Sequence, residues 1–134
     1  MTYVVLVAWL VQACVGVLLI RWWRHRTHPR VVVTHVALSV LGLALWVTYV
    51  VSDQVLWGWG ALGMIAIGNG FGDAMLLRRA RAMGGRHLSV IHAYRVALRA
   101  IFTGKLPAFV AFHAVFAGVV FFATLAVCVA ASLG

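Results

Sequence analysis

Residues 29–46 read PRVVVTHVALSVLGLALW. After its first two residues this stretch is apolar enough for a bilayer span, yet it holds the imidazole of His35 a little over one helical turn inside that span. An ionisable side chain is costly inside the hydrocarbon region, so an intramembrane histidine is a functional-site hypothesis by default. Polar residues at the same depth in the other apolar segments would belong to the same site.

The composition is that of an integral membrane protein. Of 134 residues, 65% are hydrophobic and 10% are charged, whereas about a quarter of the residues in soluble domains are charged. Four spans of about 20 residues each use most of this length. We therefore predict an all-α fold in which residues 1–134 form a single membrane domain, an integral membrane four-helix bundle.

Four apolar segments are long enough to cross a bilayer. We predict spans at about residues 3–20, 31–51, 56–77 and 107–131. The first segment has no basic stretch before it and no small-residue cleavage pattern after it, so we expect it to stay in the membrane. The third segment is rich in glycine, which in a membrane helix indicates close approach by a neighbouring backbone or a flat ligand.

A fifth helix is predicted at about residues 86–104, where an apolar side and a basic side alternate at helical spacing. The apolar side holds Ile91, Tyr94, Leu98 and Ile101, and the basic side holds His92, Arg95 and Arg99. This pattern predicts an amphipathic helix on the cytoplasmic surface, where its arginines meet anionic lipid headgroups.

All eleven Lys and Arg residues lie in two of the three connections between the predicted spans. Four arginines follow the first span and seven cations lie between residues 78 and 105, with none near either terminus. The positive-inside rule places these loops in the cytoplasm and both termini outside, as in a bacterial inner membrane. Topology thus explains the net charge of +9, and nucleic acid is not a predicted partner, since it needs a basic face on a soluble body.

Polar residues of the spans gather at one depth. His35 and Asp73 lie five residues inside the arginines that flank their spans, and His113 lies six residues after the proline that opens its own. The rise of about 1.5 Å per residue places these three about 7 to 9 Å inside the cytoplasmic boundary. Asn69 and Gln12 lie about 13 Å inside it. All four spans therefore contribute to one polar layer.

The two histidines of this layer lie in segments that run in the same direction, so they face each other if the helix rotations allow it. Two facing imidazoles are the axial pair that a b-type haem needs, and bundle cores commonly hold such cofactors. A small residue follows each histidine by one turn, Ser39 after His35 and Ala117 after His113, which gives clearance for a porphyrin edge. We predict haem b as the cofactor, with both histidines as metal ligands.

Other residues have predicted roles around this haem. Asp73 or Asn69 would accept the second ring N–H of a ligating histidine, which fixes its tautomer and raises its basicity. The cations expected to pair with the haem propionates lie at the cytoplasmic boundary: Arg30, Arg78, Arg79 and Lys105. Quinone is a further expected cofactor.

With these residues the chain resembles the four-helix transmembrane b-type cytochromes, which include ascorbate- or quinone-linked cytochromes and the membrane subunits of respiratory dehydrogenases. The resemblance rests on His35 and His113 in parallel spans with small neighbours. It implies electron transfer with quinone or a cytoplasmic-side partner, as a subunit of an oxidoreductase complex or as a homo-oligomer. Such cytochromes commonly carry two haems, whereas the outer half of this chain has no intramembrane histidine; one haem alone would not relay electrons across the bilayer.

Three alternatives remain open at this point. Buried histidines can hydrogen-bond across a bundle, and each such contact contributes about 1 kcal/mol of stability. Asp73 can extend its carboxylate toward the neighbouring arginines at the membrane boundary. A non-catalytic anchor or accessory subunit would use the basic loops to dock a partner or anionic lipids. A proton or ion pathway would use the four polar residues of the layer, His35, Asn69, Asp73 and His113.

Hydrolytic catalysis has almost no support in the sequence. It contains no Ser/His/Asp arrangement, no paired carboxylates and no phosphate-binding loop. With two acidic residues in the whole chain, a carboxylate-rich metal site is excluded too.

Overall fold

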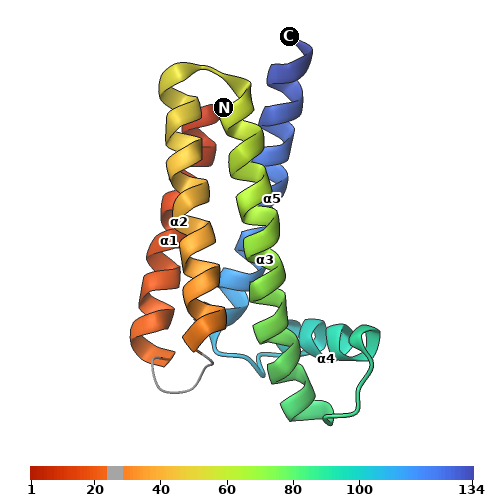
Figure 1. Ribbon diagram of the computed structural model, residues 1–134. Coiled ribbons are helices and arrows are strands. Elements are labelled where there is room, and N and C mark those ends of the chain that lie inside the picture. The colour runs from red at the N-terminus through yellow and green to blue at the C-terminus, as the bar shows by residue number, and fades with distance from the viewer. Residues whose placement is uncertain (24–28) are drawn as a thin grey trace.

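The computed structural model describes residues 1–23 and 29–134. These residues form five helices: α1 (Thr2–Trp23), α2 (Pro29–Ser52), α3 (Val55–Gly84), α4 (Val90–Phe102) and α5 (Ala108–Leu133). All except α4 are long and apolar enough to cross a membrane. These four run alternately up and down, and α4 lies across one end of the bundle (Figure 1). The described chain is therefore all-helical, with four candidate spans.

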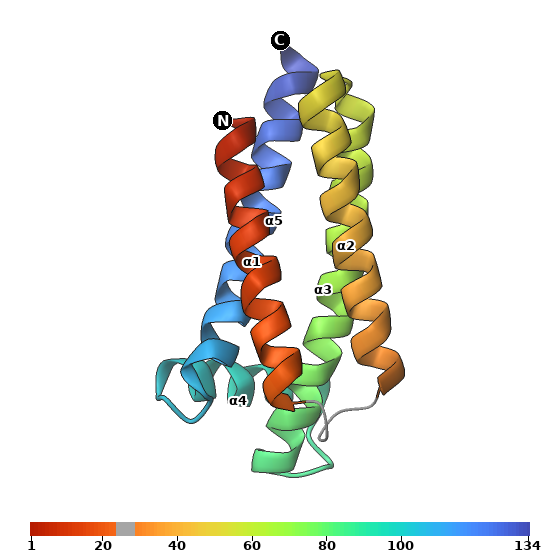
Figure 2. The same ribbon diagram turned by 90° about the vertical axis from the view of Figure 1, so that its left-hand side faces the viewer.

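The two ends of the bundle differ in charge. The connection after α1 and the helix α4 lie at one end, which we call the basic end, while both termini and the α2–α3 turn lie at the other (Figures 1 and 2). Arg24 and Arg26, which belong to the first predicted basic loop, lie outside the described residues. The described Lys and Arg residues therefore lie at one end of the bundle, and the positive-inside prediction rests on this separation of charge.

Each span has two neighbours in the bundle. α2 packs most extensively along α3, α1 packs along α5, and contacts of α3 with α5 and of α1 with α2 close the bundle. Figure 2 shows α1 beside α5 and α2 beside α3. α2 and α5 therefore lie on one diagonal, so side chains that point inward from these two helices meet at the centre.

The packed core lies in the half of the bundle away from the basic end. Trp46 is completely buried there, and Nε1 of Trp9 donates a buried hydrogen bond of 3.1 Å to Oγ1 of Thr124. The other buried hydrophobic side chains of this cluster come from all four spans: Val5, Tyr49, Ala61, Leu62, Ile65, Val120, Val127 and Cys128.

The half of the bundle toward the basic end is less densely packed. It comprises residues 10–21, 29–41, 66–79 and 108–119, and none of the described side chains in these ranges is completely buried. This half contains the predicted polar layer. The spans are therefore joined by an apolar core in one half and surround the polar residues in the other.

α3 continues beyond residue 77, where its predicted span ends, to Gly84. Gly85 ends the helix with a φ of 120°, a conformation that residues with a side chain rarely adopt. α4 then begins at Val90, because the side chain of Ser89 caps it by accepting a hydrogen bond from the backbone N–H of His92. The helix is shorter than the predicted segment of residues 86–104 because this cap lies inside that segment.

α4 packs on α3 through a face of alanines that the sequence analysis did not single out. Ala93 and Ala97 are buried against Ala80 of α3. The apolar side predicted for this helix is divided: Ile91 is 67% exposed and Leu98 is 51% exposed, whereas Tyr94 and Ile101 are partly buried. The basic residues His92, Arg95 and Arg99 are exposed.

Candidate functional site

The histidines predicted as a pair lie together at the centre of the bundle. The ring centres of His35 and His113 are 6.2 Å apart, and the ring planes are inclined at 72°. The rings come from α2 and α5, the helices of one diagonal, and both side chains are partly buried. The helix rotations, which sequence alone leaves open, therefore turn both imidazoles inward.

A backbone carbonyl of α3 orients His35. Nδ1 of His35 lies 2.8 Å from the carbonyl oxygen of Gly68. A carbonyl only accepts hydrogen bonds, so Nδ1 carries the proton and donates it. In the neutral ring Nε2 then has a free lone pair. An Nδ1–H donated to a backbone carbonyl is a common way to orient a histidine that binds a metal.

Gln12 of α1 contacts His113. Its Nε2 donates a hydrogen bond of 3.0 Å to the backbone carbonyl of His113 and lies 3.4 Å from Nε2 of that ring, at the long limit for a hydrogen bond. Two buried atoms of this contact, Oε1 of Gln12 and Nδ1 of His113, have no hydrogen-bond partner among the described residues. Each of these two side chains therefore has one buried polar atom that makes no described hydrogen bond.

Glycines lie against both rings. A Cβ added to Gly16 would lie 3.3 Å from Cε1 of His113, and one added to Gly72 would lie 3.3 Å from Cε1 of His35. Both distances are shorter than ordinary van der Waals contact, so a side chain at either position would displace the ring. Gly63, by contrast, has no atom within 4 Å of such a Cβ. Of these two glycines of the third span, Gly72 therefore makes room for a histidine ring and Gly63 does not.

Asp73 faces α4 rather than the histidines. The hydroxyl of Tyr94 donates a hydrogen bond of 2.8 Å to Oδ2 of Asp73. This bond, with a smaller contribution from burial, raises the pKa of Tyr94 above its usual value of 10.0. In the described chain no hydrogen bond joins Asp73 or Asn69 to either histidine. The role of orienting acceptor, predicted for these two residues, is taken by the Gly68 carbonyl in the case of His35.

Of the four cations predicted to meet haem propionates, Arg30, Arg78 and Lys105 are exposed and Arg79 is partly buried. Arg30 lies in the first turn of α2, and its carbonyl accepts a hydrogen bond from the hydroxyl of Thr34. Arg78 lines a cavity together with Arg81, Ala82 and Arg86. Neither arginine makes a described hydrogen bond to the histidine pair, and their pairing with haem propionates stays a prediction.

The separation of the two histidine rings is close to that of two imidazole ligands on one metal. Two imidazoles on opposite sides of one metal, each bound at about 2 Å, have ring centres about 6 Å apart, and the observed distance is 6.2 Å. The described residues contain no group of three or more His, Cys, Asp or Glu that could hold a metal ion. A haem suits a pair better than a bare ion does, because the porphyrin brings its own ring of nitrogen ligands.

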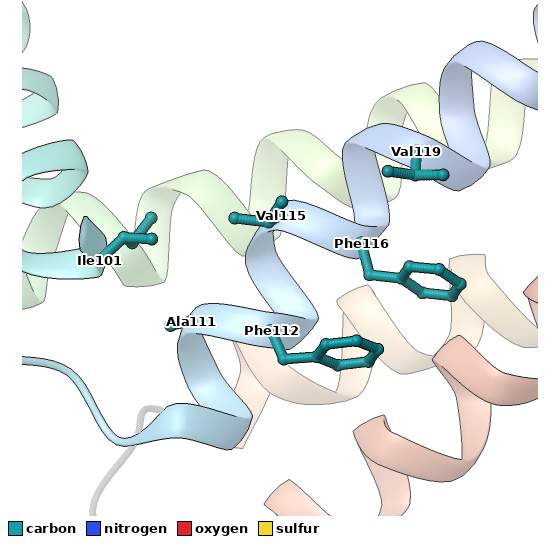
Figure 3. Close-up of a pocket in the computed structure, with 6 residues that line it drawn as sticks. All are labelled: Ile101, Ala111, Phe112, Val115, Phe116 and Val119. Atoms are coloured by element: carbon teal, nitrogen blue, oxygen red, sulfur yellow. The ribbon is translucent and has the colours of Figure 1, made fainter. Parts of the chain in front are cut away.

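A separate apolar cavity lies between α4 and α5, and Figure 3 shows the side chains that line it. Its volume is about 260 Å³. One residue comes from α4 and five from α5: Ile101, Ala111, Phe112, Val115, Phe116 and Val119. Since every lining side chain is apolar and His113 is not among them, this cavity offers no metal ligand and is not the histidine site.

Comparison with known proteins assigns no family to this chain. No protein-family model, curated protein or solved structure matches it. A functional assignment therefore rests on the residues and their geometry.

Proposed function

We propose that this protein binds a b-type haem through His35 and His113 and acts in membrane electron transfer. The observation that carries the proposal is the pair of inward-facing imidazoles on diagonal spans, with ring centres 6.2 Å apart. The bond from Nδ1 of His35 to the Gly68 carbonyl leaves Nε2 free to ligate. When bound, the haem would supply a one-electron carrier, and the protein would supply its ligands and surroundings.

The surroundings of the pair support the same proposal. The half of the bundle that contains it has no completely buried side chain among the described residues. Gly16 and Gly72 let the two imidazoles lie directly against α1 and α3, because a side chain at either position would displace a ring. Among the described residues, Oε1 of Gln12 and Nδ1 of His113 are buried without a hydrogen-bond partner, and an unsatisfied buried polar group costs about 1–3 kcal/mol. Hydrogen bonds within the described bundle therefore do not by themselves account for these two side chains.

The proposed setting is a bacterial inner membrane, with the basic end in the cytoplasm and both termini outside. In this orientation α4 would lie along the inner surface, with Arg95 and Arg99 toward anionic headgroups and Ile91 and Leu98 toward the acyl chains. The exchange partner of the haem would then be quinone or a protein on the cytoplasmic side, within an oxidoreductase complex.

An absorbance difference spectrum tests the haem assignment. The full chain is purified in mild detergent from cells supplied with haem, and the dithionite-reduced minus oxidised spectrum is recorded for the wild type, His35→Ala and His113→Ala. His87→Ala, at an exposed position, is the matched control. We expect a sharp b-type band in the wild type and the control, and none in the two ligand variants.

A second substitution separates ligation from folding. His113→Met keeps a side chain that can bind haem iron, and an axial methionine raises the reduction potential. We expect a retained band with a higher midpoint potential. A wild-type spectrum without a haem band, or a band that survives both alanine substitutions, would show that the proposal is wrong.

An accessory role in a larger complex is the alternative function. It is favoured by the apolar side of α4, where Ile91 and Leu98 are 67% and 51% exposed. If this function is the right one, the purified protein will carry no haem and will co-isolate with a partner protein, and alanine at Ile91 and Leu98 will release that partner.

A further inference from the structure

Three arginines line one cavity at the basic end, and this cavity is open to the surface. Its volume is about 250 Å³ and its lining residues are Arg78, Arg81, Ala82 and Arg86. Arg78, Arg81 and Ala82 lie on one face of the last turns of α3, because residues three and four positions apart are neighbours on a helix. Gly85, with its φ of 120°, turns the chain after α3, and Arg86 follows it directly. The end of α3 and the turn thus build one cationic cavity.

No carboxylate of the chain balances these guanidinium groups. The sequence has two acidic residues, of which Asp53 lies in the α2–α3 turn at the opposite end and Asp73 accepts the hydrogen bond of Tyr94. In the described chain none of the three arginines of the cavity forms an ion pair. Like charges around one cavity repel each other, so an anion bound among them would be stabilised by all three.

One of these arginines is already held in place. Nε of Arg81 donates a hydrogen bond of 3.2 Å to the carbonyl of Leu88, in a partly buried position. The terminal nitrogens of Arg81 remain available to a ligand, and a guanidinium fork matches the oxygens of a phosphate group. Arginines near a helix C-terminus also complement the helix dipole, but this effect does not require them to line a common cavity.

The depth of the cavity indicates where the phosphate comes from. Arg78 directly follows the predicted third span, and α3 rises about 6 Å from Arg78 to Ala82. The headgroup layer on each side of a bilayer is about 5–8 Å thick. We propose that this cavity binds the phosphate of an anionic phospholipid headgroup. The inference rests on the proposed membrane placement and is independent of the haem.

Native mass spectrometry of the detergent-solubilised full chain tests this inference. The protein is titrated with phosphatidylglycerol and, for comparison, with zwitterionic phosphatidylcholine. Arg78→Gln/Arg86→Gln is compared with Arg95→Gln/Arg99→Gln, which removes the same charge from exposed positions on α4. Each arginine near an anionic lipid contributes roughly fivefold in affinity. We expect the first pair to weaken phosphatidylglycerol binding roughly 30-fold and the second pair to leave one tight site intact.

Three results would overturn the inference. Equal binding of the two lipids by the wild type would show that the cavity does not select a negative headgroup. Equal weakening by both glutamine pairs would show a diffuse charge effect. Stabilisation of the wild type by inorganic phosphate but not by phosphatidylglycerol would assign the cavity to a soluble anion.

Two controls keep these results interpretable. Arg78→Lys/Arg86→Lys keeps the charge, so retained binding by this variant shows that the glutamine pair acts through charge rather than misfolding. Retention of the wild type in alkali-washed membranes tests the membrane placement separately.

Discussion

The hydrogen bond between Tyr94 and Asp73 provides a quantitative test of how α4 is held on α3. The donor and acceptor are 2.8 Å apart, the acceptor is a carboxylate, and both residues are partly buried. Tyr94→Phe removes the hydroxyl and keeps the ring. A hydrogen bond to a charged group contributes about 1.5–3 kcal/mol, and solvent screening at a partly exposed site reduces this to about 1–2 kcal/mol. We therefore expect α4 to detach from α3 about 5 to 30 times more often in the variant.

Hydrogen exchange measures this change directly. Amide protection across residues 94–102 of α4 should fall by about the same factor of 5 to 30, while protection in α1 and α5 stays unchanged. Tyr3→Phe is the matched control, because Tyr3 is 70% exposed on α1. Unchanged protection of α4, or an equal loss over the whole chain, would refute the assignment of this bond as the contact that fastens α4.

The same bond makes a prediction about pH. The carboxylate of Asp73 raises the pKa of Tyr94 above 10.0. Because the pKa is raised in the folded state, the stabilisation is complete below the pKa of a free tyrosine and is lost as the pH rises through the raised pKa. Docking of α4 should therefore be constant at neutral pH and weaken above pH 10 or so. An ultraviolet titration of tyrosinate should show one more late-titrating group in the wild type than in Tyr94→Phe; the same curve in both proteins would contradict this.

Two further substitutions test the core and the histidine layer. Thr124→Val removes the acceptor of the buried Trp9 N–H and should lower the free energy of unfolding by about 1–3 kcal/mol, so an unchanged denaturation midpoint would speak against a role for this bond. Gly72→Ala places a methyl group 3.3 Å from the ring of His35 and should displace the ring by a few tenths of an ångström, lowering haem occupancy. Gly63→Ala, in open space, should not, and equal effects of the two alanines would exclude crowding as the cause.

The helical architecture could be predicted because its signals are local. Long apolar runs and cations confined to two connections indicate spans without any knowledge of tertiary contacts. The ends of the helices are harder to predict from the sequence. An apolar run ends at Leu77, but the helix continues to Gly84, because arginine, alanine and methionine are good helix formers. Hydrophobicity reports where the bilayer would end, whereas the helix ends where Gly85 adopts a positive φ.

The histidine layer was only partly accessible from sequence. Equal depth in parallel segments predicts that His35 and His113 meet, and this needs only the rise per residue. Their partners depend on helix rotation, which is set by many contacts at once. The sequence predicts the depth of Gln12 but no role for it. It does not single out Gly16, because a single small residue is common in an apolar run. Asp73 was expected to face the histidines, but it bonds Tyr94, a residue that the pattern placed on the apolar side of α4.

The pairing of α1 with α5 has a consequence for biosynthesis. Trp9 and its hydrogen-bond acceptor Thr124 are 115 residues apart. A ribosome adds about 5–20 residues per second, so roughly 6 to 23 s separate the synthesis of the two partners. Throughout this interval α1 lacks its main neighbour, and the indole of Trp9 and the amide of Gln12 lack the contacts that α5 later provides. Closure of the bundle therefore follows the synthesis of α5, and any factor that delays α5 prolongs the life of an open intermediate.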